Sequence, residues 1–99
     1  MATLHIVRRS PHMARDLERA LEVARPGSHV LLVQDAVLAA SEADSSRGLL
    51  ERAMRAGVGV HALKEDLASR AVARVVGGVD VVDYEGWVDL VEAHQPVAW

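Results

Sequence analysis

Four short aliphatic segments, separated by stretches with helical spacing, constrain the fold of this chain more than any other feature. They are residues 3–7, 29–34, 58–63 and 79–83. Strands buried on both faces are continuous runs of Val, Ile and Leu, and strands that alternate with helices form parallel sheets with right-handed crossovers. Hydrophobic residues make up 51% of the chain and aromatic ones only 3%, which suits aliphatic strands packed under helices. The pattern predicts an α/β fold, a small three-layer α/β/α domain with a mainly parallel sheet of four to five strands, spanning residues 1–99 as a single domain.

The first helix is predicted from its start signal, its apolar stripe and its stop signal. Ser10 is expected as the N-cap and Pro11 as the first helical residue. The Arg-Pro-Gly sequence at 25–27 should end the helix, because proline disfavours helical geometry in the preceding residue and glycine permits the turn. The predicted inward stripe consists of Met13, Leu17, Ala20, Leu21 and Ala24.

The later helices are predicted from similar signals. Asp35 is expected to cap a short helix over 35–40, and a further helix should begin at Ser45 or Ser46 and end at Gly57. Residues from Lys64 onward should form one or two helical turns. Asp83 is expected to cap the last helix, whose stripe consists of Trp87, Leu90, Val91 and His94.

Composition and missing motifs exclude several functions. The net charge of −3 disfavours direct binding to nucleic acid, which needs clustered cations. The absence of cysteine removes disulfides, thiolate metal sites and a cysteine nucleophile. No glycine-rich phosphate loop is present, so no nucleotide cofactor is predicted, and the five histidines form no His-x-x-x-His pair, so no metal site is predicted. No segment has the roughly 20 apolar residues of a membrane span, and a cytoplasmic protein is expected.

Polar residues follow the predicted strands, where the functional crevice of a parallel sheet lies. Arg8, Arg9 and Ser10 follow the first strand, Gln34 and Asp35 end the second, and Asp66 follows the third. These six residues are therefore predicted to form a polar crevice or an interface with another subunit. The two arginines beside a helix start would also suit an anion.

An acid/base enzyme that uses Asp35 or Asp66 lacks a visible partner constellation, so no catalytic residue is assigned. A phosphoacceptor role for Asp35 is disfavoured because the first strand ends in arginines rather than in further carboxylates. Trp99 is predicted as an interface residue, because a large apolar side chain beyond the last helix has no local reason for burial.

Several stretches in order along the chain resemble the DsrH/TusB family of sulfur-relay proteins. They are LHIVRRSP near the start, HVLLVQDAVLAA, VHALKEDLASRAV, VDVVDYEGWVDLV and the terminal VAW. The resemblance implies a parallel-sheet fold shared with DsrE-like and DsrF-like subunits. It also implies a heterohexamer with DsrE/TusD-like and DsrF/TusC-like partners, a TusA-like sulfur donor and a DsrC/TusE-like acceptor.

Such complexes pass a persulfide sulfur between cysteines, for 2-thiolation of the tRNA wobble uridine or for dissimilatory sulfur oxidation. Some DsrH-like members carry a cysteine in the first helix, at the position of Ala20 here. Persulfide chemistry needs a thiolate, so this chain is expected to be a non-catalytic subunit rather than an enzyme. The alternatives left open are a stand-alone anion- or ligand-binding domain and a homo-oligomer in the absence of partners.

Overall fold

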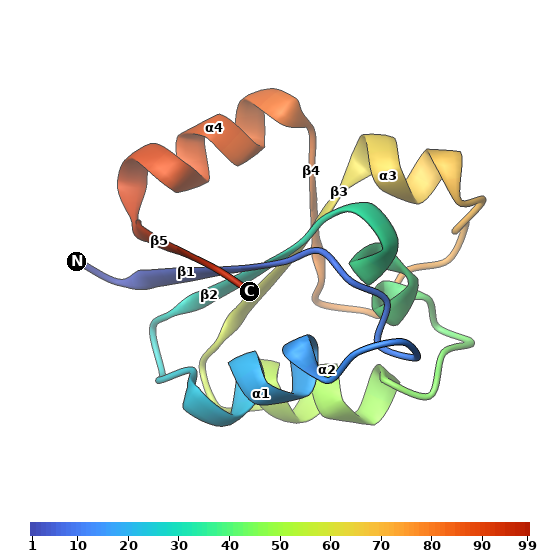
Figure 1. The fold of residues 1–99 in the computed structure, drawn as a ribbon, viewed down its shortest axis with the longest axis horizontal. Coiled ribbons are helices and arrows are strands. Elements are labelled where there is room, and N and C mark those ends of the chain that lie inside the picture. Colours follow the sequence, from blue (N-terminus) through green and yellow to red (C-terminus); the bar gives the residue numbers. More distant parts are fainter.

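A five-stranded, entirely parallel sheet forms the centre of the computed structural model, which describes residues 1–99 (Figure 1). The strand order is β4-β3-β2-β1-β5. The predicted fold class is confirmed, and the four predicted strands are present, the first with the predicted bounds and the other three slightly shorter. The strands are β1 (Thr3–Val7), β2 (His29–Leu32), β3 (Gly59–Leu63), β4 (Asp80–Val82) and β5 (Gln95–Ala98).

The fifth strand, β5, was not located in the sequence, and it lies at the edge of the sheet beside β1. The amides of Gln95 and Trp99 donate to the carbonyls of Ala2 (2.8 Å) and Ile6 (3.0 Å). Because alternate residues of a strand bond to the same side, Pro96 turns its nitrogen away from β1. Proline is tolerated in this position on an edge strand.

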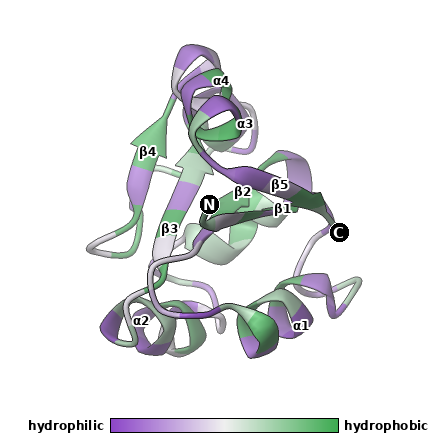
Figure 2. Ribbon diagram, turned by 90° about the vertical axis from the view of Figure 1, so that its left-hand side faces the viewer, coloured by the Kyte–Doolittle hydropathy of each residue, from purple (hydrophilic) through white to green (hydrophobic).

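Helices cover both faces of the sheet, and two short helices lie at its carboxyl edge (Figures 1 and 2). The helices α1 (Asp16–Val23) and α2 (Arg47–Arg55) cover one face of the sheet, and α4 (Tyr84–Ala93) covers the other. The 3-10 helix η1 (Gln34–Ala40) and helix α3 (Lys64–Ser69) follow β2 and β3 directly at the carboxyl edge. No helix combines the length and the apolarity that a bilayer crossing needs.

The two faces of the sheet have separate cores. Alternate strand residues such as Val30 and Leu32 join Leu17, Ala20 and Leu50 in a cluster of 14 buried residues on the α1/α2 face. On the α4 face only four hydrophobic residues are buried, and α4 itself contributes partly buried side chains. The four are Leu4, Leu31, Val33 and Leu63. The predicted stripe of α4 therefore faces the sheet, but the cover that it provides is thin.

The predicted start of the first helix is wrong. Helix α1 begins at Asp16, and the Ser10 hydroxyl instead accepts a hydrogen bond from the His12 amide (3.2 Å). The carbonyl of Ser10 accepts from the amides of Met13 and Ala14, so residues 10–14 form a separate turn. A serine that bonds to its own turn competes with helix formation. Met13 therefore lies outside the helix and is 85% exposed, although the stripe was predicted to bury it.

The last helix begins as predicted. The Asp83 carboxylate accepts a hydrogen bond from the Gly86 amide (2.9 Å), which caps α4. Ser46 stands in the N-cap position of α2, but its side chain makes no capping bond. Both α2 and α4 thus begin where the sequence predicted, but only α4 has a side-chain cap.

Candidate functional site

The carboxyl edge of the sheet brings three of the predicted residues together. Gln34 follows β2 with a positive φ of 50°, a conformation that L-residues rarely adopt. Its amide donates to Oδ2 of Asp66 in α3 (2.6 Å). A carboxylate that accepts from a backbone N–H forms a strong, charge-assisted bond. Asp66 therefore holds the loop after β2 against α3.

Asp35 lies beside this contact but does not cap a helix, so that prediction is wrong. Because η1 already begins at Gln34, the N-cap position belongs to Val33, which has no capping side chain. The Asp35 carboxylate accepts instead from Nε of Arg70 (2.9 Å). The same guanidinium reaches Oδ1 of Asp66 (3.5 Å). Arg70 thus joins the two acids that the sequence analysis singled out.

The three residues after β1 form a different arrangement. Arg9 pairs with Asp16 at the start of α1, with Nε and Oδ2 2.7 Å apart. Arg8 is exposed, its side chain makes no hydrogen bond or ion pair, and its carbonyl accepts from the Ala36 amide (3.1 Å). Ser10 belongs to the turn described above. Of these residues, only Arg8 leaves its charged group free for another molecule.

The carboxyl edge contains polar groups but no catalytic arrangement. Asp35 and Asp66 both pair with Arg70, and no nucleophile lies within hydrogen-bonding distance of a base there. Oε1 of Glu65 is buried without a hydrogen-bond partner. Paired acids and a free arginine suit recognition of another molecule better than proton transfer.

The Trp99 side chain packs against its own chain. Its indole N–H donates to Nδ1 of His5 (3.1 Å), and its ring packs against the larger core. This contact was not predicted from the sequence, because it depends on the pairing of β5 with β1, which brings Trp99 beside His5. The predicted interface role of Trp99 stays a prediction, but its side chain is only partly exposed.

A histidine cluster on the α4 face was also missed. His29 and His61 are hydrogen-bonded ring to ring (3.0 Å, Nδ1 to Nε2), and His61 Nδ1 lies 2.8 Å from Oδ2 of Asp80. His94 at the end of α4 stacks on His29, with ring centroids 4.3 Å apart. The cluster was detectable in principle, since alternation along β2 and β3 places His29 and His61 on the face of Leu31 and Leu63.

The hydrogen-bond order in this cluster follows from the carboxylate. An ionised Asp80 only accepts, so His61 donates from Nδ1 and, when neutral, accepts at Nε2 from His29. Burial, followed by the charges of His94 and His61, lowers the pKa of His29. No three His, Cys, Asp or Glu side chains in the structure converge on a metal position. The cluster is therefore a hydrogen-bonded chain of rings in which His29 resists protonation.

Gly59 provides the space for this cluster. A Cβ atom at Gly59 would lie 2.5 Å from Nδ1 of His29 and 3.3 Å from Nε2 of His61. A glycine inside a strand often marks such a close approach. A larger residue here would displace the His29 ring.

Comparison with known proteins decides the family. A model of the DsrH family, described as DsrH like protein, matches residues 9–97. The chain belongs to the DsrH family. Protein TusB of Erwinia tasmaniensis is 35% identical over 98 residues, covering 97% of this chain and 99% of its own length. Protein TusB of Enterobacter sp. strain 638 is 38% identical over 92 residues, covering 92% and 93%.

Two solved structures share the fold of this DsrH-family chain at lower identity. The ychN protein of E. coli superposes with a TM-score of 0.82 at 16% identity and covers 100% of both chains. MTH1491 from Methanobacterium thermoautotrophicum, a protein of unknown function, gives a TM-score of 0.70 at 19% identity, covering 99% of this chain and 97% of its own. Both likenesses concern the fold alone.

Ala20 is the position that the family resemblance aligns with a cysteine of some DsrH-like proteins. It lies on the inward side of α1 and is 0% exposed. An alanine fills a tightly packed site there, in a chain that has no cysteine at all. The surface of this DsrH-family member therefore offers no thiol for sulfur transfer.

Proposed function

We propose that this chain is a non-catalytic subunit of a sulfur-relay complex that serves 2-thiolation of the tRNA wobble uridine. The family match over residues 9–97 is the observation that carries the proposal. The name TusB of both relatives favours tRNA thiolation over dissimilatory sulfur oxidation. Without a cysteine, the chain leaves the persulfide to its partners, a DsrE/TusD-like and a DsrF/TusC-like subunit in a heterohexamer.

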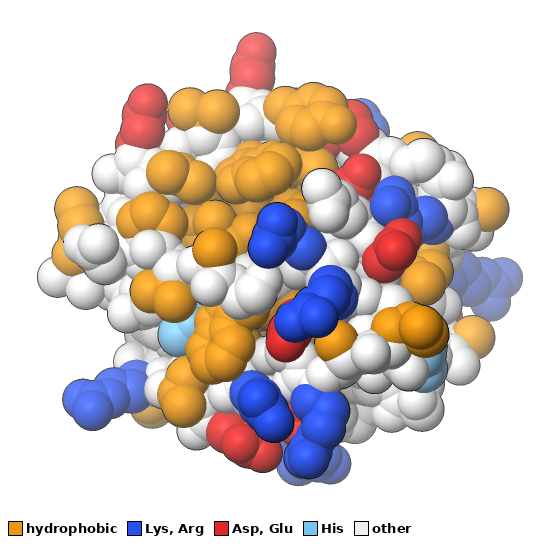
Figure 3. All heavy atoms as spheres, in the orientation of Figure 1, with side chains coloured by type: hydrophobic (Ala, Val, Ile, Leu, Met, Phe, Trp, Pro, Cys, Tyr) orange, Lys and Arg blue, Asp and Glu red, His pale blue; other side chains and the backbone are white.

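The surface of α4 supports a role in assembly. Tyr84, Trp87, Val88 and Val91 follow the i, i+3, i+4, i+7 spacing and are here called the α4 patch. Trp87 and Val91 pack partly against the sheet, so Tyr84 and Val88 form the exposed part of the patch. Tyr84 is 55% exposed and Val88 54%. Figure 3 shows apolar side chains gathered over and beside α4, whereas charged side chains of both signs are mixed over the lower and right parts of this face. An exposed apolar patch of this kind typically marks a protein interface.

Three of the polar residues predicted from the sequence are included in the proposed interface. We place Arg8, Gln34 and Asp35 at a polar rim that orients the partner, with the α4 patch as its apolar centre. Interfaces commonly combine an apolar centre with a polar rim, and rim charges steer association more than they stabilise it. The partners, the stoichiometry and the cytoplasmic location remain parts of the proposal.

Co-purification tests the assembly. The tagged chain is co-expressed with the DsrE/TusD-like and DsrF/TusC-like proteins of the same cell, and the purified complex is weighed by native mass spectrometry. We expect a complex that contains two copies of each chain. The variant Val88→Asp should abolish association, whereas Arg8→Glu should slow it and Glu51→Gln on the opposite helix layer should leave it unchanged. A chain that purifies alone in the presence of both partners would contradict the proposal.

The cellular role needs a separate measurement. Deletion of the gene should remove 2-thiouridine from tRNA hydrolysates analysed by mass spectrometry, and the wild-type chain should restore it. Unchanged 2-thiouridine in the deletion strain would redirect the proposal toward sulfur oxidation.

A further inference from the structure

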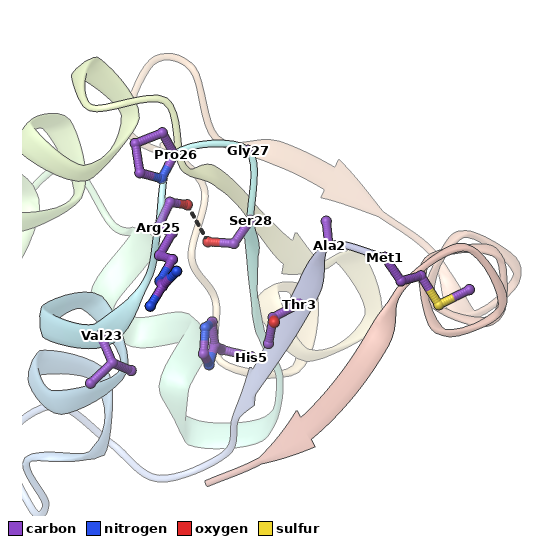
Figure 4. A pocket seen from close by; sticks show the side chains of 9 residues that line it. All are labelled: Met1, Ala2, Thr3, His5, Val23, Arg25, Pro26, Gly27 and Ser28. Atoms are coloured by element: carbon purple, nitrogen blue, oxygen red, sulfur yellow. Dashed lines mark hydrogen bonds between the residues drawn. The ribbon is translucent and has the colours of Figure 1, made fainter.

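A hollow of about 530 Å³ opens at the amino edge of the sheet, opposite the carboxyl edge described above (Figure 4). Its walls come from the start of β1 and from the end of α1 with the loop that leads into β2. None of the nine lining residues carries a carboxylate side chain, while one is an arginine and one a histidine. The lining residues are Met1, Ala2, Thr3, His5, Val23, Arg25, Pro26, Gly27 and Ser28.

His5 presents an unpartnered donor to this hollow. It is only 6% exposed, and its Nδ1 accepts the indole N–H of Trp99 (3.1 Å). An indole nitrogen can only donate, so Nδ1 is unprotonated and the ring carries its hydrogen on Nε2. No protein atom pairs with Nε2, and this nitrogen is not fully buried, because His5 lines the hollow. The ring thus offers the hollow an N–H donor that has no acceptor within the protein.

Arg25 supplies the charge beside this donor. Its carbonyl accepts both the hydroxyl (2.6 Å) and the amide (2.9 Å) of Ser28, which fixes the loop. Its guanidinium makes no hydrogen bond or ion pair within the chain. Figure 4 shows the Arg25 side chain extending from the loop toward the imidazole of His5. Two free donors therefore lie in one hollow.

We propose that this hollow binds the oxyanion group of a small molecule, a carboxylate or a phosphate, through Nε2–H of His5 and the guanidinium of Arg25. Guanidinium groups match such oxyanions with paired hydrogen bonds. The neutral N–H of His5 beside the guanidinium provides a hydrogen bond from a second direction. The apolar walls formed by Val23 and Pro26 suit a ligand with a short carbon skeleton. The site goes beyond the proposed function, because it requires neither a partner chain nor sulfur.

Trp99 is the positioning residue of this site. It does not line the hollow, and it acts through His5 by fixing which ring nitrogen carries the hydrogen. Protonation of His5 would place two donors against one another at Nδ1, so the imidazole binds in its neutral form. Anion binding should consequently persist at pH values where free imidazoles are uncharged.

Titration of the isotopically labelled full chain tests the site. Inorganic phosphate and acetate are added separately at constant ionic strength, with chloride as the reference, while amide and histidine-ring signals are followed by NMR. We expect saturable shifts at Gly27, Ser28 and the His5 ring with at least one of the two anions, and the tighter one identifies the group. Shifts that do not saturate with either anion would overturn the site.

Variants separate the site from general attraction to positive charge. Arg25→Gln should weaken binding about tenfold or more, as expected for loss of a charged donor. Arg74→Gln removes an equally exposed arginine outside the hollow and should change nothing. Equal weakening by both variants would overturn the proposal.

The positioning role has its own readout. Trp99→Phe should let the His5 hydrogen move to Nδ1, visible in the ring ¹⁵N shifts, and should weaken binding several-fold in a chain that still gives a folded spectrum. An unchanged ring tautomer would overturn the role of Trp99. The co-purification experiment is independent of these titrations, so failure of one proposal is distinguishable from failure of the other.

Discussion

The face of the sheet beneath α1 and α2 buries 14 core residues, whereas the face beneath α4 buries four. Two helices with fully buried aliphatic residues cover the first face, and one helix without a buried residue covers the second. The second face also contains a polar chain of rings, which the first face lacks. The larger core makes the α1/α2 face the main source of stability, and the thinly covered α4 face is the one on which the proposed contact with a partner lies.

The largest expected effect separates the two cores directly. Leu50→Ala on α2 should lower the free energy of unfolding by about 2–5 kcal/mol, because it leaves a cavity in a fully buried site. Leu90→Ala on α4 should cost only about 1 kcal/mol, because its side chain is partly exposed. Urea denaturation measures both. Equal losses would show that the two faces contribute alike.

The histidine cluster can be broken through the backbone. Gly59→Ala should lower the free energy of unfolding by about 1–3 kcal/mol, because the new methyl group collides with the His29 ring. The double variant with His29→Ala should recover much of that loss, and a double-mutant cycle measures the coupling. Additive losses would mean that the strain lies elsewhere in β3.

The helix starts offer a matched pair of substitutions. Asp83→Ala should cost about 1 kcal/mol, because its carboxylate caps α4 on the thinly covered face. Ser10→Ala should cost less, since Ser10 stabilises only a turn before α1. Thermal denaturation of the two variants compares them. A larger loss for Ser10→Ala would restore the N-cap role that the sequence suggested.

The smallest expected effect is a pH dependence. The folded-state pKa of His29 lies below its ordinary value of 6.5. As the pH falls below 6.5, the unfolded chain therefore binds more protons than the folded chain does. The stabilising contribution of neutral His29 is therefore complete above about pH 6.5 and is lost as the pH falls through the folded-state pKa. Burial lowers the pKa of His5 in the same direction on the other face.

Denaturation at pH values from 8 to 5 separates these contributions. His29→Gln should flatten the decline in stability. A decline that is unchanged in His29→Gln would assign the pH dependence to His5 or to other groups.

Sequence patterns predicted the elements that depend on local signals. The aliphatic strands and the Asp83 cap follow from periodicity and side-chain chemistry within a few residues. The strand β5 was missed because Gln95–Ala98 is short, contains proline and is exposed, so only pairing with β1 defines it. The loss of the Asp35 cap likewise depends on a distant residue, since Arg70 lies 35 positions away in the chain.

The candidate sites depended on such distant contacts even more strongly. Gln34, Asp35 and Asp66 follow neighbouring parallel strands, whose carboxyl ends lie at the same edge of the sheet. Their proximity was therefore predictable from the topology. The contact of Trp99 with His5 joins residues 94 positions apart. Single-sequence periodicity contains no information about such a pair.

The pairing of β5 with β1 also fixes the order in which the sheet can be completed. Residues 95–98 are synthesised long after residues 3–7, yet they form the only neighbour of β1 on that side. During synthesis β1 therefore presents an open hydrogen-bonding edge until β5 has emerged. Such edges recruit strands from other molecules, so the nascent chain is vulnerable to aggregation until β5 docks.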